Sequence, residues 1–156
     1  MNADIGLKES SRAKILAILD PVLADEYLLY TKTRNFHWNI VGFHFSAMHK
    51  FFEGQYEQLD GFVDDTAERS RALGGRALGS MKEFLAHARL KESTNRTGKE
   101  EVLLAELVRD HEALIRTLRA YVDETTRLGD AGTADFLTGL LEEHEKMAWM
   151  LRSFVS

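Results

Sequence analysis

The sequence contains no cysteine and only one proline among its 156 residues. Without cysteine the chain cannot form disulfides, cysteine-ligated zinc sites or iron–sulfur clusters, and it has no thiol nucleophile. One proline against 11 glycines favours long helices, because proteins rich in loops or short strands usually contain more proline.

Two further absences concern charge and long hydrophobic runs. The 20 basic and 25 acidic residues give a net charge of −5, which argues against a broadly basic surface for nucleic acid. No segment has the apolar length of a signal peptide or a membrane span. Since 44% of the residues are hydrophobic, the length suits one domain. We therefore expect a soluble, cytoplasmic single domain over residues 1–156, with residues 1–10 as a short tail and no membrane partner.

Apolar residues recur at helical spacing in four long stretches, residues 11–39, 46–73, 97–129 and 133–156. Pro21 lies inside the first stretch, where we expect a kink or a break between two helices. The first and second stretches are joined by a short link, as are the third and fourth, so each pair should be antiparallel. Residues 74–96 are enough to cross the whole bundle. Two hairpins joined by one long crossover predict an all-α, ferritin-like four-helix bundle.

Capping signals refine this expectation. Ser80 and Glu83 have the spacing of a capping box, which predicts a short helix over residues 81–88 within the crossover. Thr97 and Glu100 have the same spacing and predict the start of the third long helix.

The side chains best suited to metal chemistry lie between His37 and Glu68. His49 and Glu53 are four residues apart, as are Asp64 and Glu68, and the two pairs share one helix face. Carboxylates with imidazole suit divalent iron, manganese or zinc. The pairs lie about 22 Å apart along a straight helix, so one helix cannot bring both to one ion. Antiparallel packing against a second copy could do so, with His37 nearby, and this predicts an intersubunit metal site.

Other interpretations of these residues remain open. An acidic stripe is often only a solvated helix face, because repulsion within it costs only about 0.2–0.5 kcal/mol per pair. A ferritin-like internal di-iron site needs Glu-x-x-His on two helices, and none of the six histidines has glutamate three residues before it. His44 should lie in a loop, and surface or interface positions are expected for the remaining three histidines, which are His87, His111 and His144.

Several segments closely resemble the signature of the Dps family, the DNA-protecting mini-ferritins of starved cells. They are NFHWN at residues 35–39, Gly42, Phe45, His49, DDTAER at residues 64–69, DFL at residues 135–137 and HEKMAW at residues 144–149. The resemblance extends over nearly the whole chain, and the spacing of its central His-Trp, His and Asp-x-x-x-Glu elements is specific.

This resemblance implies a stress-response protein that assembles into a dodecameric hollow shell, with ferroxidase sites at its twofold interfaces. Carried over by position, His37, His49 and Glu53 of one subunit would bind iron together with Asp64 and Glu68 of its neighbour. Relatives often have aspartate at the position of Glu53. The implied substrates are Fe(II) and hydrogen peroxide, the product is an Fe(III) mineral inside the shell, and the benefit is protection of DNA from oxidative damage.

The resemblance also assigns roles beyond the metal ligands. Trp38 matches a tryptophan beside the iron site that acts as an electron or radical sink, although an amphipathic interface aromatic explains it equally well. Asp130 and Asp135 flank the start of the fourth helix, where carboxylates suit the helix dipole. In the family, carboxylates of this region line the pores through which Fe(II) enters. Thr133 is the expected N-cap of that helix.

Two rival functions belong to other classes. The first is a nucleoid-associated protein that mainly binds and compacts DNA, with little ferroxidase activity. Residues 1–10 carry a net charge of −1, so we expect DNA binding to be weak or indirect, because phosphate neutralisation needs clustered Lys or Arg. The second is a purely structural bundle, which would be a monomer or simple dimer without iron oxidation.

Overall fold

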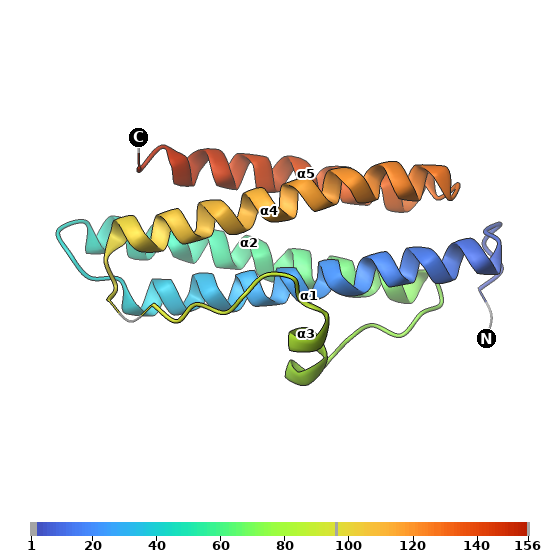
Figure 1. Ribbon diagram of the computed structural model, residues 1–156, viewed down its shortest axis with the longest axis horizontal. Helices are drawn as coiled ribbons and strands as arrows, with labels where there is room; N and C mark the ends of the chain where they lie inside the picture. Colours follow the sequence, from blue (N-terminus) through green and yellow to red (C-terminus); the bar gives the residue numbers. More distant parts are fainter. Residues whose placement is uncertain (1–2, 96, 156) are drawn as a thin grey trace.

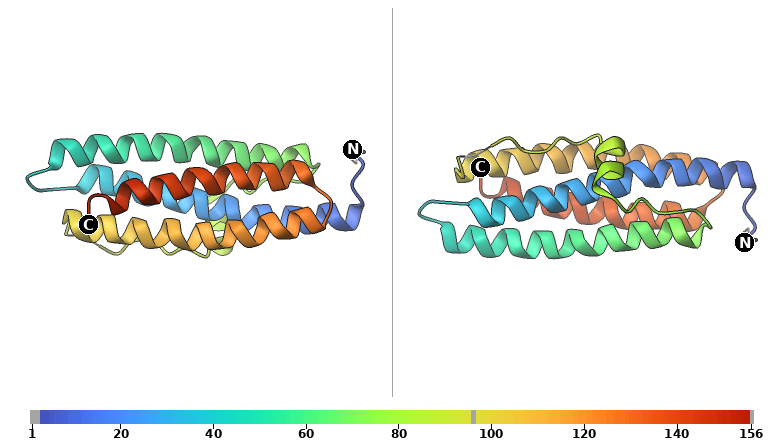
Figure 2. Two further views of the ribbon diagram at one scale, coloured as in Figure 1. Left: turned by 90° about the horizontal axis from the view of Figure 1, so that it is seen from above. Right: turned by 90° about the horizontal axis from the view of Figure 1, so that it is seen from below.

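The computed structural model describes residues 3–95 and 97–155, and its ordered elements are all helices. They are α1 (Glu9–Asn39), α2 (Phe45–Ala72), α3 (Met81–His87), α4 (Glu100–Arg127) and α5 (Ala131–Arg152). The four long helices form a bundle of two antiparallel hairpins, α1 with α2 and α4 with α5 (Figures 1 and 2). The all-α, ferritin-like prediction is therefore confirmed.

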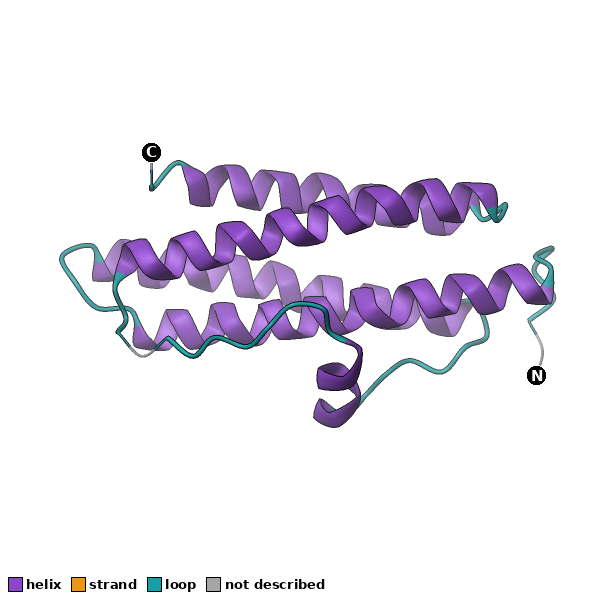
Figure 3. Ribbon diagram, viewed as in Figure 1, coloured by secondary structure: helices purple, strands orange, loops and turns teal. Residues whose placement is uncertain are grey.

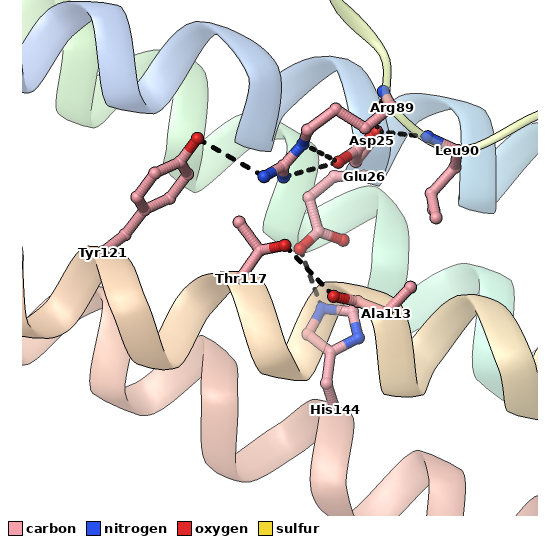
Figure 4. A network of polar contacts seen from close by, with 8 residues as sticks. All are labelled: Asp25, Glu26, Arg89, Leu90, Ala113, Thr117, Tyr121 and His144. Carbon is pink, nitrogen blue, oxygen red and sulfur yellow. Dashed lines mark hydrogen bonds and ion pairs between the residues drawn. The ribbon is translucent and has the colours of Figure 1, made fainter.

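The crossover between α2 and α4 runs along one side of the bundle and contains α3, which packs against α1 (Figures 1 and 3). A small apolar cluster holds α3 in place, and in it the Phe84 ring stacks on the Tyr27 ring at 4.2 Å between centroids. Asp25 anchors the segment that follows α3. Its buried carboxylate accepts hydrogen bonds from the backbone N–H groups of Arg89 and Leu90 and from the Arg89 guanidinium (Figure 4).

The main core runs along the bundle axis and draws on all four long helices. Large side chains that solvent does not reach fill it, among them Leu19, Leu29, Phe52, Leu59, Leu107, Leu118, Leu137 and Leu151. None of the helices in the described part of the chain has the length and hydrophobicity that a membrane span requires.

Local signals predicted some helix boundaries and missed others. The short crossover helix is confirmed, and Ser80 Oγ accepts from the Glu83 N–H at 3.3 Å as its cap. The break considered at Pro21 is wrong, because α1 continues through it as one helix of 31 residues.

Thr97 does not cap α4, which begins at Glu100 and has no side-chain cap. The backbone N–H and the hydroxyl of Thr97 both donate to Asn95 Oδ1 at 2.8 Å, so Thr97 closes a local turn before the helix. Thr133 is not the N-cap of α5 either. That position belongs to Asp130, whose carboxylate accepts from the Thr133 N–H at 3.0 Å.

Candidate metal centre

His37 and His49 face each other where the α1–α2 hairpin turns. Their rings stack with centroids 3.7 Å apart. The Nδ1 atom of His37 lies 2.7 Å from the backbone oxygen of His49. In the same way, the Nδ1 atom of His49 lies 2.8 Å from the backbone oxygen of His37. Because a carbonyl oxygen only accepts, each Nδ1 must carry the hydrogen and donate it. In this tautomer of the neutral ring the lone pair is on Nε2, as in histidines that bind metals through that atom.

The end of α1 makes this arrangement possible. In a continuing helix the carbonyl of His37 would accept from the N–H of residue 41. Here α1 ends at Asn39, and the Val41 N–H donates to the Gly98 oxygen at 3.1 Å instead. The free carbonyl of His37 can then fix the orientation of the His49 ring.

Aromatic side chains enclose the two histidines on their outer sides. The Phe45 ring stacks on His49 at 5.1 Å, and the Tyr56 ring meets the edge of His37 at 5.2 Å. The guanidinium carbon of Arg34 lies 5.1 Å from the centre of the Trp38 ring. Trp38 itself is 64% exposed, so its ring is not enclosed by the described chain.

The acidic residues of α2 are not gathered at the histidine pair. Glu53 is half-buried one turn after His49, whereas Asp64 and Glu68 are exposed farther along the helix. Among the described residues, no group of three or more histidine, aspartate or glutamate side chains is placed to hold a metal ion. Of the predicted ligands, the described chain brings together the two imidazoles, and a metal centre would need further ligands.

The two aspartates considered for an iron pore differ in their surroundings. Asp130 is 5% exposed, caps α5 and accepts from the Arg69 guanidinium at 3.0 and 3.2 Å. Burial raises the pKa of Asp130, but the hydrogen bonds from Thr133 and the charge of Arg69 outweigh this and leave it below its ordinary value. Its carboxylate is thus engaged within the chain, whereas Asp135 is exposed.

The expected surface or interface positions of His111 and His144 are wrong, because both side chains are fully buried. They contact each other in the core, and His144 also contacts the buried Glu26. The sequence did carry a signal for this. His111 lies four residues after Leu107 and three before Leu114, on the apolar stripe of α4.

Comparisons with known proteins agree with this fold. A family model described as a ferritin-like domain matches residues 16–156. DNA protection during starvation protein 2 of Bacillus anthracis is 33% identical over 143 residues, which cover 92% of this chain and 97% of the relative. The chain belongs to the Dps family.

Further similarities of this Dps chain extend over its whole length. A low-temperature-induced protein of Nostoc is 48% identical over 153 residues, which cover 97% of this chain and 86% of the relative. The crystal structure of the Dps protein from Vibrio cholerae superposes with a TM-score of 0.94 at 30% identity, covering 100% of this chain and 98% of that one. That protein is described as a member of a broad superfamily of ferritin-like diiron-carboxylate proteins.

Proposed function

We propose that this Dps protein is an iron-storing ferroxidase. It oxidises Fe(II), preferably with hydrogen peroxide, at sites shared between subunits, and it stores Fe(III) as mineral inside a dodecameric shell. The observation that carries the proposal is the pair of hydrogen bonds that orients His37 and His49 and leaves both Nε2 atoms available. Family membership supports iron as the metal, since the superfamily is one of diiron-carboxylate proteins.

The ligands divide the chemistry between two subunits. The imidazoles of His37 and His49, with Glu53, would bind incoming Fe(II) on one subunit, and Asp64 and Glu68 of the partner subunit would complete the site. Carboxylates favour the more highly charged Fe(III) electrostatically, so they stabilise the product of oxidation more than the substrate. The exposed positions of Asp64 and Glu68 leave both carboxylates accessible to a second copy.

The reaction balances with peroxide as oxidant. Two Fe(II) ions each give up one electron, and one hydrogen peroxide with two protons takes up both electrons and becomes two water molecules. Pairing the two oxidations at one site avoids the hydroxyl radical that a single Fe(II) would produce. Protection of DNA then follows from the removal of Fe(II) and peroxide together, without direct binding of DNA.

The first test is an anaerobic Fe(II) titration of the assembled protein, followed by peroxide and monitored by the absorbance of Fe(III). We expect a saturable fast phase above the protein-free control. In Glu68→Ala this phase should slow strongly while the mass of the assembly stays unchanged. The matched control is Glu142→Ala, an exposed glutamate on α5, which should react like the wild type. Unchanged oxidation by an intact Glu68→Ala assembly would contradict the proposed site.

A further inference from the structure

Three ionisable side chains meet in the interior of the bundle, away from the proposed iron site. Glu26 of α1, His111 of α4 and His144 of α5 are each 0% exposed. His144 Nε2 lies 2.8 Å from Glu26 Oε1 (Figure 4), and His144 Nδ1 lies 2.9 Å from His111 Nδ1. We call these three residues the core polar chain. It joins the α1–α2 hairpin to the α4–α5 hairpin.

The hydrogen bonds limit how many protons the core polar chain can hold. A hydrogen bond between two Nδ1 atoms exists only when one of them carries the hydrogen and the other accepts it. His144 can therefore be doubly protonated, donating to Glu26 and to His111, while His111 stays neutral. A proton on both Nδ1 atoms would replace this hydrogen bond with two donors and two positive charges in contact.

Burial makes the contact between Glu26 and His144 important for both side chains. A lone carboxylate without a compensating charge is costly in the interior, and an imidazolium beside it supplies that charge. A second proton on His111 would find no carboxylate, because the only acceptor near that ring is His144. In the described structure Glu26 Oε2 and His111 Nε2 are buried without a hydrogen-bond partner, so no further hydrogen bond stabilises the charged form of His111.

The neighbouring charged groups are engaged elsewhere. From α1, Lys32 pairs with Asp110 and Glu106 of α4, and Asp25 pairs with Arg89 of the crossover. The glutamates next to the two histidines in sequence also have partners of their own. On α4, Glu112 pairs with Arg152. On α5, Glu143 contacts Lys146 and Gln58, and Glu145 pairs with Arg119. From α2 the Phe62 ring faces His144 at 5.5 Å. The buried residues of α2 include no ionisable side chain.

We propose that the core polar chain is an acid-sensitive link between the two helical hairpins. It provides a carboxylate beside His144 but none beside His111, and so makes the folded bundle progressively less stable as the pH falls. This inference does not depend on the ferroxidase assignment, because none of the three residues belongs to the proposed iron site.

The direction of the pH effect follows from linkage. Burial, and then the charge of His144, hold the pKa of His111 well below its ordinary value of 6.5 in the folded protein. Below pH 6.5 the unfolded chain therefore binds a proton at His111 that the folded chain does not. The unfolding equilibrium constant should rise about tenfold for each pH unit from this site alone, which corresponds to about 1.4 kcal/mol.

The test is denaturant unfolding of the full chain at several pH values from 7.5 to 5.0, at fixed protein concentration and ionic strength. Fixed concentration is needed because subunit association adds to the measured stability. His111→Gln removes the side chain that binds a proton only in the unfolded chain. Below pH 6.5 the unfolding equilibrium constant of this variant should therefore rise less steeply with acid than that of the wild type, by up to about tenfold per pH unit. Glu26→Gln keeps an acceptor for His144 but removes the compensating charge. A charge on either buried histidine then has no carboxylate beside it, so the unfolding equilibrium constant should rise more steeply with acid than in the wild type, by up to about tenfold per pH unit.

The control is His44→Gln, because His44 also lies beside a carboxylate, Glu100 at 3.0 Å, but is exposed. Its pH dependence should match the wild type. Wild-type slopes in both core variants, or a shallower slope in Glu26→Gln, would overturn the proposal. If a variant fails to fold, hydrogen exchange of the wild-type protein provides an independent test. After correction for intrinsic rates, the protection of the slowest-exchanging core amides should fall as the pH is lowered from 6.5 to 5.0, by up to about tenfold per unit. Protection that stays constant over this range would contradict the link.

Discussion

The orientation of His37 and His49 decides which ring nitrogen can bind iron. Each ring is fixed through Nδ1 by the backbone oxygen of the other residue, at 2.7 and 2.8 Å. In the proposed site the pair would bind through Nε2 without first breaking a hydrogen bond, and the rings would lose little freedom. Spacing and the family resemblance predicted both histidines as ligands, but they could not predict this reciprocal arrangement, which depends on where α1 ends.

His49→Asn separates the structural role of this ring from its proposed metal-binding role. The asparagine amide reaches about as far as Nδ1, so it can still donate to the His37 oxygen, but it has no counterpart of Nε2. We expect an unchanged thermal midpoint and an Fe(II) affinity lower by at least about tenfold, measured by anaerobic titration. His44→Asn in the exposed loop is the control. An Fe(II) affinity equal to that of the wild type would exclude His49 as a ligand.

The two buried histidines show why residue chemistry alone can mislead. Histidine is usually partly exposed, and neither His111 nor His144 has a metal-ligand partner at a suitable spacing, so surface or interface positions seemed the simplest expectation. Both residues nevertheless lie on apolar stripes, and the interior accepts them because Glu26 lies opposite on α1. A contact between residues 118 positions apart leaves no local pattern, so this network could not be predicted from spacing.

At the scale of helices, periodicity predicted more than capping signals did. All four long helices and the short crossover helix are where their apolar patterns and the Ser80 signal indicate. Thr97 failed as a cap because α4 begins only at Glu100 and has no side-chain cap, and Thr133 failed because Asp130 supplies the capping carboxylate. Asn95 engages Thr97, and Asp130 takes the capping position before Thr133. Competition among neighbouring polar side chains is decided by geometry, which the spacing of a capping box does not contain.

Two glycines should respond in opposite ways to alanine. Gly61 lies within α2, and an added Cβ would meet nothing within 4 Å, so Gly61→Ala should raise the free energy of unfolding by about 1 kcal/mol. Gly98 has a φ of +63°, and an added Cβ would lie 2.4 Å from the Asn39 oxygen. Gly98→Ala should therefore lower stability by at least about 1 kcal/mol. Denaturant unfolding measures both, and shifts of the same sign would contradict this account of the backbone.

At the scale of the whole molecule, the single chain explains why the proposed site needs a partner. His37 and His49 lie where α1 ends and α2 begins, while Asp64 and Glu68 lie about four to five turns after His49 along α2. The helix is continuous over this distance, so no motion of the side chains alone can unite the two sets. The distance between the two sets of side chains could be predicted from the sequence because it depends only on the rise of the helix. Contacts with a second subunit could not be predicted in this way, because they depend on how two chains pack.

Mixed assemblies test whether the two sets of ligands come from different subunits. One variant, His37→Ala with His49→Ala, lacks the imidazoles, and the other, Asp64→Ala with Glu68→Ala, lacks the carboxylates. When each is assembled alone, fast iron oxidation should disappear. In a co-assembled 1:1 mixture, half of the twofold pairs combine both variants, and each such pair has one complete site. About a quarter of the sites should therefore be active. Native mass spectrometry verifies that the two variants have mixed. If the mixed assembly oxidised iron no faster than either variant alone, the two sets of ligands would not form a shared site between subunits.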